Sequence, residues 1–166
     1  MPDWITHILA AWMICTILSF KYKQINPAYT VVCMVGALIP DTFKIVIPLG
    51  VMGIRAENIF MPFHLPIGSL IIASIFTLFF KDHKKLVLSL LVLGVATHYA
   101  LDLLLTNLNG GMALLFPFSW NSWALNVIPD DDYHITILAM GLALVVYFVS
   151  FWVRKRGESD KITDQP

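Results

Sequence analysis

Residues 85–105 read KLVLSLLVLGVATHYALDLLL, and this stretch decides the fold class. A helix made of these 21 residues is about 30 Å long, which matches the hydrocarbon core of a bilayer. Beyond Lys85, its only acidic or basic side chains are His98 and Asp102. A helix that is apolar on all sides is typical of a membrane span.

The composition of the whole chain also indicates a membrane protein. Apolar residues make up 58% of the 166 residues and charged residues only 13%, about half the charged share of soluble domains. A soluble domain this short could not bury so much apolar surface, whereas lipid accepts it on every side. The net charge of zero gives no basic field for nucleic acid. Cys15 and Cys33 lie in apolar runs, which predicts small hydrophobic side chains rather than a disulfide.

We expect an all-α polytopic transmembrane helix bundle that forms a single domain over residues 1–153. Its predicted spans lie at about residues 4–20, 28–48, 62–80, 85–105 and 133–153. Pro40 is expected to break the second span, which would continue as an interfacial or re-entrant piece through Gly50 and Gly53. No positively charged segment precedes residues 4–20, so we interpret them as a span rather than a signal peptide.

Basic residues predict the orientation of these five spans. They follow the first, third and fifth spans, at Lys21 and Lys23, at Lys81, Lys84 and Lys85, and at Arg154, Lys155 and Arg156. Alternating spans put all three clusters on one side, which the positive-inside rule makes cytoplasmic. The N-terminus and an aromatic loop over residues 106–132 are then outside. The polar tail, residues 154–166, is cytoplasmic and expected to be disordered from residue 157.

Ionisable side chains within the spans predict a functional site. At a helix centre such a residue costs about 2.5–3.5 kcal/mol, so it usually faces the bundle interior and has a partner. The predicted topology brings five of them, from four spans, to one outer layer: His7, Asp41, His64, His98 and Asp102. Imidazole and carboxylate are ligands for zinc, manganese or iron. We therefore expect a divalent metal ion here.

Structural interpretations of the same residues stay open. His98 and Asp102 share one helix face, so both could bind metal, or Asp102 could orient the imidazole of a hydrogen-bonded core histidine. Asp41 could form an ion pair with Lys44. His7 could be an interfacial anchor, and His64 could mark the start of a helix. His83 and His134 are expected to be solvated.

Several fragments occur together in a fixed order. They are Thr6-His7, GALIPD at 36–41, His64, GVATHYALD at 94–102 and GMALLFPF at 111–118. Over about residues 4–120, the chain thereby resembles the YdjM-like family of predicted membrane-bound metal-dependent hydrolases. The order His, Pro-Asp, His, His-x-x-x-Asp is also similar to the ligand pattern of zinc-dependent phospholipase C. The resemblance implies a metal, zinc first, on His7, Asp41, His64, His98 and Asp102, with Asp41 and Asp102 catalytic.

The leading functional hypothesis is a metal-dependent hydrolase at the outer membrane face. Its substrate would be a phosphoester or a lipid-like molecule, and Asp41 is the best candidate for a general base. The alternative is a small transporter or ion-binding protein, because the interrupted second span resembles the discontinuous helices of transporters. A third hypothesis makes the metal a staple for a partner-binding bundle. The expected location is the cell membrane, crossed several times, and homo-oligomers stay open.

Overall fold

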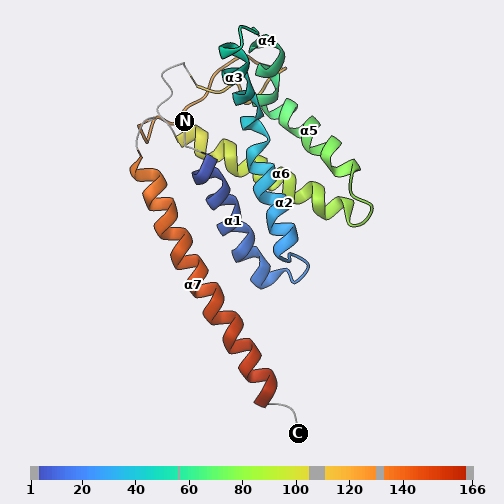
Figure 1. Cartoon of the computed structure of the whole chain (residues 1–166), viewed down its shortest axis with the longest axis vertical. Helices are drawn as coiled ribbons and strands as arrows, with labels where there is room; N and C mark the ends of the chain where they lie inside the picture. The colour runs from blue at the N-terminus through green and yellow to red at the C-terminus, as the bar shows by residue number, and fades with distance from the viewer. Residues whose placement is uncertain (1–3, 56, 105–110, 130–132, 164–166) are drawn as a thin grey trace.

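The computed structural model describes residues 4–55, 57–104, 111–129 and 133–163. Within these ranges the chain is helical, with one isolated β-bridge and no strand, which confirms the all-α prediction. In chain order the elements are α1 (Trp4–Lys21), α2 (Pro27–Leu38), η1 (Pro40–Ile45), α3 (Val46–Val51), α4 (Glu57–Phe60), η2 (Met61–His64), α5 (Pro66–Leu78), α6 (Lys84–Leu104) and α7 (His134–Thr163) (Figure 1).

Three of these helices are long and apolar enough to cross a membrane. They are α1, α6 and the His134–Arg156 part of α7. The α2 helix and the Pro40–Val51 segment make a fourth candidate span, bent by 54°. The α5 helix has 13 residues and is therefore about 20 Å long, short of the roughly 30 Å of hydrocarbon.

The second span breaks where the sequence predicts it. The α2 helix ends at Leu38, and a 3-10 helix begins at Pro40, which has no N–H to continue the α-helical ladder. The last four carbonyls of an α-helix lack partners within the helix. The break therefore leaves carbonyls at the end of α2 free to accept hydrogen bonds from other elements.

The third predicted span begins later than the sequence indicates. Residues 62–64 belong to the 3-10 helix η2, and α5 starts only at Pro66. Leu65 is extended (φ −96°, ψ 149°), because the ring of a following proline disfavours the helical conformation. Proline suits the first position of a helix, where no N–H is needed. His64 consequently lies in a turn rather than within a long helix.

The central helix of the bundle is α6. Half of the residues in the most apolar 18-residue stretch of α6 are buried, against 28% in the corresponding stretch of α1 and 17% in that of α7. One face of α6 joins a cluster of buried residues, which comprises Ile39, Ala73, Val87, Leu91, Val95, Tyr99 and Met112. Another face contributes Leu90 to a second cluster, with Ala11, Cys15, Ile25, Cys33 and Ala37. Side chains at the end of α6 are thus held by packing on two sides.

Two glycines bring α2 and α6 into backbone contact. A Cβ on Gly36 would overlap the backbone of Leu91, and a Cβ on Gly94 would overlap that of Cys33. Small residues at such crossings are typical of helix pairs in membranes, because they allow close approach. This crossing sets how far the end of α2 lies from the last turns of α6.

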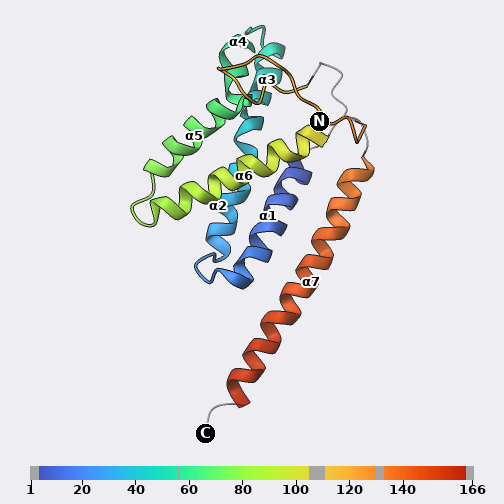
Figure 2. The ribbon, with the colours of Figure 1, turned by 180° about the vertical axis from the view of Figure 1, so that it is seen from behind.

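The α7 helix lies beside α1 and extends beyond the other helices (Figure 2). The hydroxyls of Thr6 and Thr136 are 3.2 Å apart across this contact. The helix continues to Thr163, beyond residue 157, where the sequence predicts the start of a disordered tail.

The described part of the predicted outer loop, residues 111–129, is tied to the end of α6. The N–H of Leu125 donates to the carbonyl of Leu103 at 2.7 Å, and that of Val127 donates to Leu104 at 2.9 Å. Phe118 is 94% exposed and Trp120 68% exposed; their place at a membrane interface stays a prediction.

Candidate metal centre

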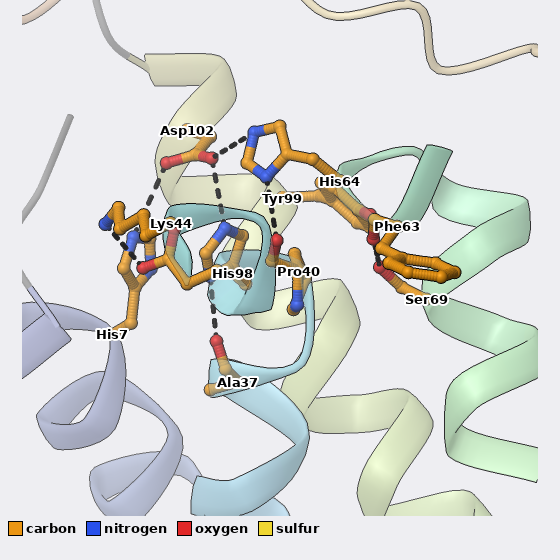
Figure 3. A network of polar contacts seen from close by, with 11 residues as sticks. His7, Ala37, Pro40, Lys44, Phe63, His64, Ser69, His98, Tyr99 and Asp102 are labelled. Carbon is orange, nitrogen blue, oxygen red and sulfur yellow. Dashed lines mark hydrogen bonds and ion pairs between the residues drawn. The ribbon is translucent and has the colours of Figure 1, made fainter. Parts of the chain in front are cut away.

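Five side chains with metal-ligand chemistry meet at one end of the bundle. Figure 3 labels His7, His64, His98 and Asp102 among them. The α1 helix supplies His7 from its first turn, η1 supplies Asp41, and His64 ends η2. His98 and Asp102 come from the last turns of α6. The structure therefore brings together all the residues selected from the sequence, although they belong to four separate segments.

The carboxylate of Asp102 is surrounded by three imidazoles. Its Oδ2 lies 3.1 Å from Nε2 of His98 and 3.8 Å from Nε2 of His64. Its Oδ1 lies 3.5 Å from Nε2 of His7. The rings of His7 and His98 are stacked, with centroids 3.8 Å apart. Each of the three histidines thus turns the same nitrogen towards one carboxylate.

A backbone carbonyl fixes the tautomer of His98. Its Nδ1 lies 2.8 Å from the carbonyl oxygen of Ala37, one of the free carbonyls at the end of α2. A carbonyl only accepts, so Nδ1 carries the proton and donates it. In the neutral ring, Nε2 then holds a lone pair. That lone pair faces the carboxylate of Asp102.

His64 is held in the same way. Its Nδ1 lies 3.1 Å from the carbonyl oxygen of Pro40, and its Nε2 is turned towards Asp102. A neutral His64 and a neutral His98 both present acceptors to a carboxylate that also only accepts. Such an arrangement is repulsive unless a cation or an added proton lies between the groups. Histidines that ligate a metal typically donate their other N–H to a carbonyl in this manner.

Several buried atoms of the cluster lack hydrogen bonds. Within the described part of the chain, Nδ1 of His7, Nε2 of His98 and Oδ1 of Asp102 have none, although all are buried. His98 and His7 are 0% and 1% exposed. Buried polar atoms without partners are costly, so each requires a physical explanation. A bound cation provides one for the convergent Nε2 and carboxylate atoms.

The spacing of the atoms fits a metal ion. Two ligands that bind one ion at about 2.1 Å are themselves roughly 3–4 Å apart. The 3.1, 3.5 and 3.8 Å contacts around Asp102 lie in this range. Two ligand groups have atoms within 4.8 Å of one another, namely His7, His98 and Asp102, and Asp41, His64 and His98. His98 belongs to both groups. Because its Nδ1 is hydrogen-bonded to the carbonyl of Ala37, only its Nε2 is left to bind an ion.

Asp41 has a cationic partner in addition to its place in the second group. Nζ of Lys44 lies 2.7 Å from Oδ2 of Asp41, so the ion pair considered from the sequence is present. The ammonium also lies 5.7 Å from the ring centroid of Trp4, close enough for a cation–π contact. The carboxylate is 4% exposed and the lysine side chain 21%. The pair therefore reaches from the buried ligands towards the surface.

Sequence reasoning did not identify the groups that orient the histidines. Backbone carbonyls of Ala37 and Pro40 hold His98 and His64, and carbonyls leave no signature in side-chain patterns. The one available signal was the break at Pro40, which predicts free carbonyls at the end of the preceding helix.

The remaining histidines lie outside both ligand groups. His134 stacks on Tyr133, with ring centroids 4.2 Å apart, and His83 has its ring centroid 6.3 Å from that of Tyr29. Neither belongs to a group of ligand atoms found among the described residues. On the sequence alone, both are expected to be solvated, and neither is counted among the ligands.

Comparison with protein families matches residues 1–159 to the family described as YdjM inner membrane protein. The match covers nearly the whole chain, including all five residues of the cluster. No curated protein and no solved structure matches the chain.

Proposed function

The chain belongs to the YdjM inner membrane protein family and is a multi-pass membrane protein, and on this premise we propose that it is a metal-dependent hydrolase. Its substrate is a phosphoester or lipid-like molecule near the outer membrane face. One observation carries the proposal: tautomers fixed by backbone carbonyls turn the Nε2 lone pairs of His64 and His98 towards the carboxylate of Asp102.

The residues divide into ligands and a base. His7, His98 and Asp102 form one group of close ligand atoms and would hold the ion, with His64, whose Nε2 lies 3.8 Å from Asp102, as a further ligand. Zinc is the first choice for such a donor set, with manganese or iron as alternatives. A divalent ion in such a site polarises a phosphoryl oxygen and acidifies water. Asp41, in the neighbouring ligand group, is placed either to complete the ligand set or to accept a proton from the attacking water.

The position of the cluster favours a substrate at the membrane surface. His7 lies in the first turn of α1, and Asp102 in the last turn of α6. A helix turn spans about 5.4 Å, so both lie within two turns of a helix end, where lipid headgroups and water meet the bundle. The outward direction of this end rests on the positive-inside rule.

Metal content tests the proposal directly. Wild-type protein without a histidine tag is purified in detergent, and its metals are counted by mass spectrometry. The His98→Ala/Asp102→Ala variant should lose a near-stoichiometric metal. The matched control is His83→Ala/Asp82→Ala, which removes the same residue types from the loop before α6 and should keep it. Metal-free wild-type protein that is folded and metal-replete during growth overturns the proposal.

The activity is tested once a metal is established. Hydrolysis of phospholipids and of soluble phosphodiesters is measured for the wild type and both double variants. Activity that is present in the wild type and the control variant but absent from His98→Ala/Asp102→Ala supports a metal-dependent hydrolase. A metal-loaded protein that turns over no phosphoester or lipid contradicts it.

A second candidate function follows from the bent second span. The 54° break between α2 and the Pro40–Val51 segment is a feature of transporters, whose discontinuous helices form ion sites. The same His and Asp cluster would then bind an ion transiently. Metal flux into vesicles containing the purified protein distinguishes this function, since a hydrolase with a resident ion carries none.

A further inference from the structure

Lys44 brings a positive charge to the edge of the metal centre. Its ammonium lies 2.7 Å from Oδ2 of Asp41, a residue whose ligand atom is within 4.8 Å of those of His64 and His98. Among the described residues, Lys44 is the only lysine or arginine that forms an ion pair with Asp41 or Asp102. The lysine side chain is also more exposed than the carboxylate it contacts.

The charge balance of the centre shows what Lys44 adds to it. Asp41 and Asp102 supply two negative charges, and a divalent cation held by neutral imidazoles offsets both. Lys44 then leaves the loaded site with one net positive charge. A lysine this close also repels the metal ion, so it does not serve metal binding. A site with this excess charge is suited to a singly charged anion, such as a phosphodiester.

We propose that Lys44 binds the phosphate group of an anionic phosphoester substrate. This inference rests on the proposed metal-dependent hydrolase. An ammonium has three donors, and the carboxylate of Asp41 accepts from one, which leaves two for phosphate oxygens. Lysine is a common phosphate ligand and acts as a compact point charge.

The surroundings of the ammonium match a headgroup site. Trp4 lies beside it, with the ring centroid 5.7 Å from Nζ, and is 53% exposed. Tryptophan favours the membrane–water boundary, where phosphate groups of lipids lie. The side chains of Lys44 (21% exposed) and His64 (19% exposed) are partly exposed, whereas the ligands His7, His98 and Asp102 are buried. A phosphate can therefore contact Lys44 without entering the buried part of the centre.

A purely structural role for Lys44 makes a different prediction. If the lysine only neutralises Asp41, its removal leaves a buried carboxylate without its partner and destabilises the centre. Metal binding and thermal stability would then fall in Lys44→Met, and anion affinity would change only as a result. If the lysine binds phosphate, metal binding stays equal or becomes tighter, because a repelling charge is lost, while anion affinity falls.

The experiment measures anion binding rather than turnover. Full-length protein in detergent is loaded with Co²⁺, whose visible spectrum responds to ligands near the ion. One arm titrates inorganic phosphate, and the other adds micelles containing phosphatidylglycerol, a lipid phosphodiester. The variants are Lys44→Met and Lys44→Arg. The matched control is Lys81→Met, which lies outside the helices, between α5 and α6.

Each outcome decides the question. A hydrogen bond to a charged group contributes about 1.5–3 kcal/mol, so we expect affinity in the responding arm to fall about tenfold to a hundredfold in Lys44→Met. Lys44→Arg and Lys81→Met should keep most of it, with cobalt content unchanged in all variants. A response to lipid only, or to free phosphate only, identifies the source of the anion. Unchanged affinity in Lys44→Met, cobalt loss in that variant, or no response in either arm overturns the inference. A wild type that binds no cobalt overturns the metal centre itself.

Discussion

Replacing Gly94 by alanine should damage the proposed metal centre without altering any of its ligands. A Cβ at this position would lie 2.6 Å from the amide nitrogen of Ala37 and 2.8 Å from the carbonyl carbon of Gly36. Ordinary contacts begin at 3.4 Å, so α2 and α6 must separate by about 1 Å. The contacting atoms belong to backbone, which cannot rotate away as a side chain can.

This displacement acts on the hydrogen bond that orients His98. Its Nδ1 lies 2.8 Å from the carbonyl oxygen of Ala37, and an added separation of about 1 Å would lengthen this distance to about 3.8 Å, beyond the usual limit of roughly 3.2 Å. Loss of the group behind a ligating histidine typically weakens metal binding about 10- to 100-fold. Overpacking of the helix crossing adds about 1–3 kcal/mol of destabilisation.

The assay compares Gly94→Ala with Gly141→Ala. A Cβ at Gly141, on α7, meets no atom within 4 Å. This control replaces glycine by the best helix former, so its stability should stay constant or rise by up to about 1 kcal/mol. Metal affinity is measured by competition with a chelator, and stability by thermal unfolding in detergent. Gly94→Ala should lose both, and Gly141→Ala neither.

The result that refutes the reasoning is a Gly94→Ala protein with wild-type metal affinity. In that case either the crossing tolerates a methyl group or the carbonyl of Ala37 does not control metal binding by His98. A variant that is less stable but still binds metal tightly while folded would also show that the hydrogen bond does not control metal affinity. It would leave the packing argument intact.

Two further predictions concern the ligands and the ion. Asp102→Asn removes the charge between three imidazoles while conserving the shape of the side chain. Mass spectrometry should therefore show loss of metal from a variant that is still inserted in the membrane. The control variant Asp82→Asn, in the loop before α6, should retain the metal. Retained metal would mean that Asp102 is no ligand. Removing metal with a chelator should lower the melting temperature of the wild type, because a ligand at 100 times its Kd stabilises a fold by about 2.7 kcal/mol. The chelator should leave the melting temperature of Asp102→Asn unchanged, and an equal shift in both proteins would contradict the site.

Much of the architecture could be predicted because it depends on local composition. Apolar runs near 30 Å in length identify α1, α6 and α7, and Pro40 marks the break after α2. The start of α5 was harder to predict, because Pro62 and Pro66 lie in an apolar stretch that hydropathy treats as one span. Hydropathy averages over many residues and does not register a turn as short as the one at Leu65.

The arrangement of the site was predictable only in part. Depth along each span places His7, Asp41, His64, His98 and Asp102 in one layer, since position along a helix follows from residue number. The same argument does not distinguish the carboxylates. The helix spacing of Asp102 from His98 and of Asp41 from Lys44 suggested different partners for them, but only the structure shows that three imidazoles surround Asp102 while a lysine pairs with Asp41.

The sequence by itself determined a helical membrane protein with five ligand-type residues near one end of its bundle. Only the tertiary structure decided which nitrogen of each histidine faces the carboxylate, which carbonyls hold His64 and His98, and where Lys44 lies. The physical reason is that hydropathy and depth depend on the single helix, whereas atomic direction depends on how helices are rotated against one another. That rotation is fixed by backbone contact at Gly36 and Gly94, between segments far apart in the chain.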